Sequence, residues 1–144
     1  MPDTDLLDAK LESLSRCLQR IEAKTPSIAK EFIRDYDAQD IVSVNVQRAI
    51  QICVDLGNHL ISSRGWKAPG TMAETFSILN ENGVLDENLA GSLARAVGFR
   101  NVSVHQYHEI DWVRVHRLVT KDLGIFRAFA GAIAPVWNTT PDSQ

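Results

Sequence analysis

Apolar residues recur every three or four positions along most of this chain, which is the spacing that gives a helix one apolar face. Over residues 5–23 the stripe consists of Leu7, Leu11, Leu14, Leu18 and Ile21. Thr25-Pro26 follows, and proline disfavours helical geometry in the residue before it while suiting the first turn of a new helix. The pattern therefore predicts a long first helix, a short second helix over residues 27–36 and a kink at Asp37.

A central segment, residues 40–63, is apolar on several faces rather than on one. Its opening letters, IVSVNV, could form a strand, but the length of the segment and its continuation at helical spacing favour a helix. A helix that is apolar all round is buried against several neighbours, so we expect this one at the centre of the fold. The glycines and the proline of SSRGWKAPG predict a loop after it.

Two shorter helices are indicated by signals at their ends. Thr71 followed by Glu74 is a capping-box pattern, and the glycine that closes NENG is expected just past the end of that helix. Asp86 starts the next helix, whose stripe contains Leu89, Leu93 and Val97. A last long helix is predicted over residues 111–134, with Pro135 as its stop. Its stripe consists of Trp112, Val115, Val119, Phe126, Ala130 and Ile133.

The chain has no alternating strand pattern, internal repeat or low-complexity run. Its 144 residues fit one domain, since single-core domains commonly contain about 100 to 200 residues. We therefore expect an all-α, single-domain, up-and-down bundle of four main helices with short accessory helices over residues 1–135. Residues 136–144 are expected to form a flexible C-terminal tail.

Composition narrows the class of protein. Apolar residues make up 44% and charged residues 23% of the chain, as in a globular rather than a disordered protein. The formal net charge of −3 gives no global attraction to phosphate, so a nucleic-acid role needs a local cationic site.

Cys17 and Cys53 lie in apolar helical patterns without zinc-binding spacing and are expected to behave as buried hydrophobes. Without a signal-peptide pattern or a membrane-spanning apolar run, we expect a cytoplasmic protein with no membrane partner.

The segment RNVSVHQY, at positions 100 to 107, concentrates polar chemistry where a helix is expected to end. Arg100 continues the apolar stripe of that helix, and a buried guanidinium must pair, bind an anion, or lie in a wet cleft or an interface. A paired arginine that holds helices together is the plainer interpretation. His105 follows five residues later, which on a helix separates the two side chains by about 140°. Either Gly98 loosens the helix, or the site is shared between two symmetry-related copies of the segment.

Arginine and histidine together suit phosphodiester cleavage. Histidine titrates near neutrality, so it can take a proton from a ribose 2′-hydroxyl or give one to the leaving 5′-oxygen, while arginine donates to the charge that grows on phosphorus. This chemistry needs no metal and no cofactor. His108, Glu109 and Asp111 raise a metal alternative, but their spacing at a helix start does not make a convincing ligand set. His59 and His116 are expected to be packing or surface residues.

Arg100-x4-His105-x-Tyr107, with polar Asn101 directly after the arginine, resembles the signature of HepT-type toxins of the HEPN superfamily. The resemblance covers most of the chain, through DLGNHLIS and through PGTMAETFSILNENGVL followed by LARAVGFRNVSVHQY. It implies a homodimeric, metal-independent endoribonuclease whose substrate is RNA, either tRNA or mRNA. The resemblance also implies that cleavage takes place in a cleft on the two-fold axis of the dimer. By the same resemblance His105 is the general acid and base, Arg100 binds the phosphate and Asn101 is a positioning group.

The family also implies a partner, a MntA-type minimal nucleotidyltransferase antitoxin that transfers AMP from ATP to the motif tyrosine, here Tyr107. An adenylyl group adds a negative charge and a bulky base beside the cleft, which would repel and obstruct RNA. Without the resemblance, Tyr107 is an ordinary interface aromatic with a hydrogen-bonded hydroxyl. Asp55, Asn58 and His59 match the family segment too and are assigned to helix packing or dimer support. Two alternatives stay open: a non-catalytic module that binds a nucleotide or a nucleotidyltransferase, and an Arg–His–Tyr network that fixes the dimer register.

Overall fold

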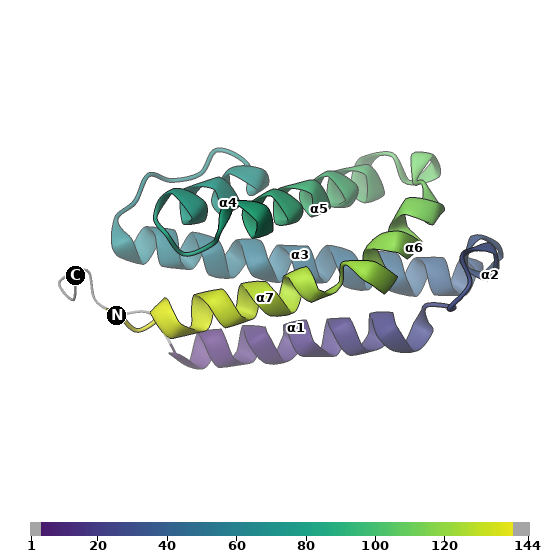
Figure 1. Cartoon of the computed structure of the whole chain (residues 1–144), viewed down its shortest axis with the longest axis horizontal. Helices are drawn as coiled ribbons and strands as arrows, with labels where there is room; N and C mark the ends of the chain where they lie inside the picture. Colours follow the sequence, from purple (N-terminus) through teal and green to yellow (C-terminus); the bar gives the residue numbers. More distant parts are fainter. Residues whose placement is uncertain (1–3, 140–144) are drawn as a thin grey trace.

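The computed structural model describes residues 4–139 and contains only helices, turns and loops in that range, so the all-α prediction is confirmed (Figure 1). The elements in chain order are α1 (Thr4–Lys24), α2 (Ala29–Arg34), α3 (Tyr36–Arg64), α4 (Met72–Glu81), α5 (Glu87–His105), η1 (Tyr107–Glu109), α6 (Trp112–Lys121), α7 (Gly124–Ile133) and η2 (Ala134–Val136). They pack around one hydrophobic core. Within the described range no helix combines the length and the apolarity that a membrane crossing requires.

Helix α3 forms the centre of the bundle, as its all-round apolarity predicted. It packs against α1, α4, α5 and α7, which surround it in Figure 1. Its buried apolar side chains lie on several faces and include Val42, Val46, Ile50, Leu56 and Leu60. Cys53 of α3 and Cys17 of α1 are free, buried thiols, and burial raises the pKa of both. Both cysteines therefore pack as the small hydrophobes that their surroundings predicted.

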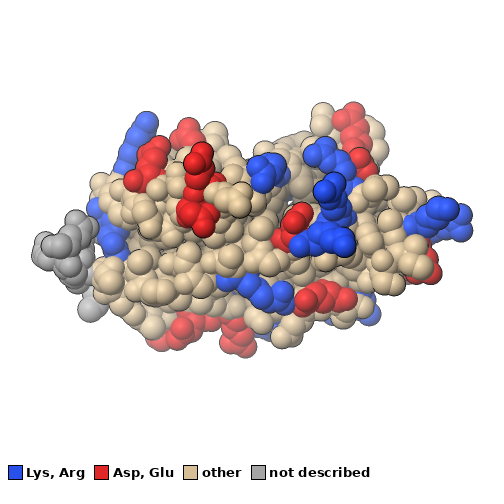
Figure 2. All heavy atoms as spheres, viewed as in Figure 1, with Lys and Arg blue, Asp and Glu red and all other residues tan. Residues whose placement is uncertain are grey.

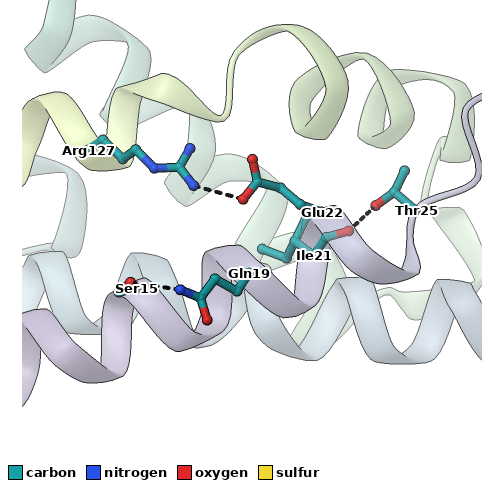
Figure 3. Close-up of polar contacts among 6 residues, drawn as sticks. All are labelled: Ser15, Gln19, Ile21, Glu22, Thr25 and Arg127. Atoms are coloured by element: carbon teal, nitrogen blue, oxygen red, sulfur yellow. Dashed lines mark hydrogen bonds and ion pairs between the residues drawn. The ribbon is translucent and has the colours of Figure 1, made fainter.

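Polar contacts fix the end of α1 and tie it to the C-terminal half of the chain (Figure 3). The Thr25 hydroxyl donates to the carbonyl of Ile21 at 2.6 Å, and the backbone amide of Thr25 donates to the same carbonyl at 3.0 Å. Arg127 of α7 donates to Glu22 at 2.7 Å. Both members of this ion pair are about half exposed, so it contributes about 0–1 kcal/mol and mainly sets orientation.

The chain breaks between α2 and α3 at Asp35, two residues before the predicted kink. The Asp35 carboxylate accepts from the amide of Ala38 at 3.0 Å and so caps α3. The buried Gln39 side chain donates to the carbonyls of Phe32 and Ile33, each at 2.9 Å. These contacts satisfy backbone groups at both sides of the break, and α2 is accordingly shorter than predicted at both ends.

The predicted end signals of α4 and α5 are confirmed. The Thr71 hydroxyl accepts from the amide of Glu74 at 3.1 Å, and the Glu74 carboxylate accepts from the amide of Gly70 at 2.9 Å. Gly83 follows the end of α4 with a φ of +77°, a conformation that glycine adopts at little cost. The Asp86 carboxylate caps α5 by accepting a backbone amide at 2.7 Å.

The prediction of a single last helix over residues 111–134 is wrong, because the chain bends between α6 and α7 at Asp122 and Leu123. The Thr120 hydroxyl donates to a carbonyl one turn back, and the amide of Ile125 donates to the Asp122 carbonyl only three residues before it. Such contacts compete with the regular helical ladder. The buried residues keep helical spacing across the bend: Val115, Val119, Leu123 and Phe126. The apolar pattern alone therefore could not reveal the break.

The packed bundle extends beyond residue 135. Trp137 is fully buried and stacks on His59, with ring centroids 5.1 Å apart. Arg64, at the end of α3, donates to the carbonyl of Val136 and, at 2.6 Å, to the hydroxyl of Thr139. The predicted start of the tail at residue 136 is therefore too early, because Trp137 belongs to the core. The rest of the predicted tail, residues 140–144, lies outside the described residues.

Candidate active site

The predicted motif lies where α5 ends, at the right-hand end of the bundle in Figure 1. Arg100 and His105 are in the last two turns of the helix, and Tyr107 begins the short turn η1. Asn101, His105 and Tyr107 are exposed, while Arg100 is partly buried. The four polar side chains thus border solvent at one end of the fold.

Arg100 and His105 do not share a face within one chain. Helix α5 continues without a break through Gly98, so the glycine does not loosen it. A separation of five residues on a regular helix sets the two side chains about 140° apart. Val104, between them in sequence, is 47% exposed. The spacing left two explanations for how Arg100 and His105 could act at one site. The explanation by a loosened helix is wrong, and a site shared between two copies of the chain stays a prediction.

Arg100 forms no ion pair with any residue from 4 to 139. Its guanidinium approaches the side-chain oxygen of Asn101 at 3.5 Å, which is at the limit of a hydrogen bond. The plainer interpretation, an arginine paired with a carboxylate to hold helices together, therefore has no support within this part of the chain. The donors of the guanidinium remain available for an anion.

Tyr107 is held by two contacts from other elements. Its hydroxyl donates to the Asp40 carboxylate of α3 at 2.5 Å. Its ring meets Trp112 of α6 edge-on, with centroids 5.8 Å apart. Partial burial, the hydrogen bond to Asp40 and the charge of Asp40 raise the pKa of Tyr107 to about 12. The phenol is therefore fully protonated at neutral pH.

Asp40 is the residue near this site that no sequence signal pointed to. It lies 67 positions before Tyr107, in the second turn of a helix whose other features indicate packing. Only the tertiary fold brings the two together, since α3 packs against α5 and the chain turns back through η1.

An aromatic row continues from Tyr107 into the fold. Trp112 meets Phe32 of α2 edge-on at 5.6 Å, and Phe32 lies 5.8 Å from the ring of His116. The His116 Nε2 atom is 2.8 Å from the carbonyl oxygen of Pro26. His116 is therefore a packing residue, as predicted, and the row supports the segment that carries Tyr107.

The residues that raised a metal alternative do not converge. His108 is 84% exposed and approaches Glu109 at 3.8 Å, while Asp111 caps α6 by accepting from the backbone amides of Val113 and Arg114. Over the described range no three His, Cys, Asp or Glu side chains are grouped as metal ligands.

The family-like segment in α3 serves helix packing, as expected. Asp55 pairs with Lys10 of α1 at 3.2 Å and accepts from Gln51 at 2.8 Å. The Asn58 side chain accepts from the Thr75 hydroxyl of α4 at 2.7 Å. These contacts join α3 to α1 and to α4 on either side.

Cationic side chains gather near the motif although the whole chain is acidic. Figure 2 shows most Lys and Arg side chains of this view on the right half of the molecule, where α6 lies, with Asp and Glu side chains among them. Arg114, Arg117 and Lys121 are exposed on α6, and that helix contains no acidic residue. This is the type of local positive surface that a nucleic-acid role requires in a protein with a net negative charge.

A family model described as Ribonuclease HepT-like matches residues 14–133. The chain belongs to this family. It is 30% identical over 129 residues to an mRNA nuclease HepT of Shewanella oneidensis, covering 90% of this chain and 96% of that protein. It is 26% identical over 106 residues to a tRNA nuclease HepT of Aphanizomenon flos-aquae, covering 74% of this chain and 72% of that protein.

The HepT fold is also found among solved structures. A tri-AMPylated Shewanella oneidensis HEPN toxin in complex with an MNT antitoxin matches with a TM-score of 0.86 and 28% identity, over 92% of this chain and 99% of that one. A toxin–antitoxin crystal structure with AMP-PNP matches with a TM-score of 0.85 and 28% identity, over 91% of this chain and 99% of that one. The resemblance carried by Arg100, Asn101, His105 and Tyr107 is therefore confirmed at the level of family and fold.

Proposed function

We propose that this HepT-family protein is the endoribonuclease toxin of a toxin–antitoxin pair and that Arg100, Asn101 and His105 carry the cleavage. The observation on which this rests is that the three side chains border solvent at the end of α5 while Arg100 has no ion pair among the described residues. A guanidinium so placed is suited to an external anion. RNA is the proposed substrate because relatives are named as mRNA and tRNA nucleases.

In the proposed mechanism His105 takes the proton of a ribose 2′-hydroxyl, and that oxygen attacks the neighbouring phosphorus. The bond from phosphorus to the 5′-oxygen then breaks, and a second histidine, His105 of another copy of the chain, gives this oxygen a proton. A 2′,3′-cyclic phosphate remains on the RNA. Arg100 donates to the phosphate oxygens as their charge grows. Asn101, which contacts Arg100, positions the guanidinium. These steps use no metal ion.

A homodimer resolves the divergence of Arg100 and His105 on α5. Two copies that meet at this end of the bundle would place the arginine of one beside the histidine of the other and supply both an acid and a base. Val104, exposed between the two residues, would be covered by such an interface.

We also propose that a MntA-type nucleotidyltransferase antitoxin neutralises the toxin by transferring AMP to Tyr107. The tyrosine is 44% exposed and follows His105 by two residues, so an added nucleotide would stand beside the imidazole. Its negative charge would repel RNA from the arginine. A structural relative that is tri-AMPylated and bound to an MNT antitoxin supports this assignment.

The cleavage experiment compares wild type, His105→Ala and His108→Ala on total tRNA and on mRNA in the presence of EDTA. His108 is a matched control because it is a highly exposed histidine three positions away. We expect cleavage by wild type and by His108→Ala, and a loss of about 10²-fold or more in His105→Ala. Intact RNA after incubation with unmodified wild type would refute the ribonuclease and leave the non-catalytic binding module.

A mixing experiment tests the shared site. His105→Ala is expected to be inactive as a pure dimer. If the site needs His105 from both subunits, exchange of subunits in a one-to-one mixture with wild type should lower the activity from about one half to about one quarter of that of wild type alone, because half of the dimers become mixed and lack one histidine. Activity that stays at one half after verified exchange would contradict a site shared between two chains.

The modification experiment uses the fact that the chain contains two tyrosines. Wild type, Tyr107→Phe and Tyr36→Phe are incubated with the nucleotidyltransferase and ATP, and their intact masses are measured. Tyr36 is 74% exposed, so it is a matched control for accessibility. AMP should be added to wild type and Tyr36→Phe but not to Tyr107→Phe; an unchanged wild-type mass would refute the proposed modification.

A further inference from the structure

The hydrogen bond between Tyr107 and Asp40 joins the modification site to a carboxylate that has no other assigned role. The Asp40 carboxylate accepts a hydrogen bond from the Tyr107 hydroxyl, with the two oxygens 2.5 Å apart, and the Tyr107 ring makes an edge contact with Trp112. Asp40 is exposed and Tyr107 is 44% exposed. A nucleotide presented by a partner protein could therefore reach the hydroxyl while it is bonded to Asp40.

The chemistry of AMP transfer requires an acceptor for that proton. A neutral phenol is a weak nucleophile, and its proton must leave as the oxygen attacks phosphorus. The surroundings of Tyr107 raise its pKa rather than lower it, so no phenolate is available in advance at neutral pH. A carboxylate within hydrogen-bond reach of the hydroxyl meets the geometric requirement for a general base.

We propose that Asp40 is the general base for the AMPylation of Tyr107, so that the toxin supplies part of the machinery for its own inactivation. This inference rests on the proposed function of Tyr107. In the step, the Tyr107 oxygen forms a bond to the α-phosphorus of ATP, the bond from that phosphorus to the bridging oxygen of pyrophosphate breaks, and the phenolic proton passes to Asp40. Pyrophosphate leaves, and the partner provides the site for ATP.

The hydrogen bond between Tyr107 and Asp40 should not survive the reaction. The modified oxygen of Tyr107 has no proton to donate, and its phosphodiester would stand as an anion next to the Asp40 carboxylate. Like charges at this distance repel. The ring of the modified Tyr107 should therefore move away from Asp40 of α3.

The test measures the rate of AMP addition by intact mass in full-length toxin with its nucleotidyltransferase and ATP. The variants are Asp40→Asn, Asp40→Glu and, as a charge-matched control on the same helix, Asp37→Asn. We expect Asp40→Asn to be slower by about 10²-fold or more at neutral pH, Asp37→Asn to match wild type, and Asp40→Glu to recover part of the rate.

A pH series separates proton transfer from a structural effect. In Asp40→Asn the rate should rise by up to about tenfold per pH unit, because the phenolate fraction grows and needs no base, so the deficit relative to wild type should shrink. A deficit that is constant with pH, together with a lowered unfolding temperature and no recovery in Asp40→Glu, would overturn the proposal.

The wild-type sample distinguishes the two hypotheses. If wild type is modified and Asp40→Asn is modified at the same rate, the Asp40 proposal is refuted while the proposed role of Tyr107 stands. If wild type itself acquires no AMP, the modification hypothesis fails first and Asp40 loses its role with it.

Discussion

Replacement of Phe32 by alanine should detach α2 from the bundle. Phe32 is fully buried and is the buried residue of this six-residue helix. It meets Trp112 edge-on, and Trp112 in turn contacts Tyr107. A helix this short has little stability of its own, so its position depends on packing.

The magnitude follows from the burial. A phenylalanine removed from a closed core site costs about 3–5 kcal/mol, and the full burial of Phe32 places it toward the upper half of that range. Domains of this kind are stabilised by about 5–15 kcal/mol in total, so the variant should fold but with a reduced margin. At about 4 °C per kcal/mol for a chain of this size, the unfolding midpoint should fall by roughly 16–20 °C.

The assays are equilibrium unfolding in urea, which gives the free energy of unfolding, and a thermal scan, which gives the midpoint. Both are followed by circular dichroism at one protein concentration for all variants, because association shifts apparent stability. Ile33→Ala is the matched control, since Ile33 is the next residue and is 41% exposed; it should cost about 1 kcal/mol or less. A loss below about 1.5 kcal/mol in Phe32→Ala, or one equal to that of the control, would refute the view that a single side chain anchors α2.

Three other contacts give predictions. Tyr107, observed by ultraviolet absorbance in a variant without another tyrosine, should ionise near pH 12 and at a lower pH after Asp40→Asn, because burial remains but the hydrogen bond and the charge of Asp40 no longer raise the pKa. Because the folded-state pKa is raised, the contact adds stability at low and neutral pH that is lost as the pH rises from about 10 through about 12; a stability difference independent of alkaline pH would contradict this. Gly57→Leu should cost about 1–3 kcal/mol in thermal unfolding, because even a Cβ there would lie 2.6 Å from Thr75 Cγ2. Trp137→Ala should cost about 3–5 kcal/mol by the same measurement, whereas an unchanged midpoint would mean that Trp137 is not part of the core.

Features that depend on local chemistry could be predicted from the sequence. Capping by Thr71 and Asp86 is determined within three residues of each, and the all-round apolarity of α3 is a property of one segment. The bend after α6 could not be predicted from periodicity, because Leu123 keeps the stripe in register across it. Asp122 and Gly124, both poor helix formers, are the signal that could have indicated it.

The candidate site also has features that could be predicted from the sequence and features that could not. The chemical character of Arg100, His105 and Tyr107 could be read from residue types and spacing. The contact of Tyr107 with Asp40 could not, because it joins positions far apart in sequence through the packing of α3, α5 and η1. Whether two copies complete the site depends on association between chains, which local patterns do not encode.

The two ends of the described chain meet at one end of the bundle, where the Thr4 hydroxyl donates to the side-chain oxygen of Asn138 at 3.2 Å. The segment from Arg100 to Tyr107 lies at the opposite end (Figure 1). Helix α1, with 21 residues, alone spans about 30 Å of that separation. An affinity handle, a fluorophore or a sensor surface joined at either end would therefore stand well away from incoming RNA and from a docking nucleotidyltransferase. Immobilised protein is thus suitable for measuring the binding of RNA and the binding of a nucleotidyltransferase.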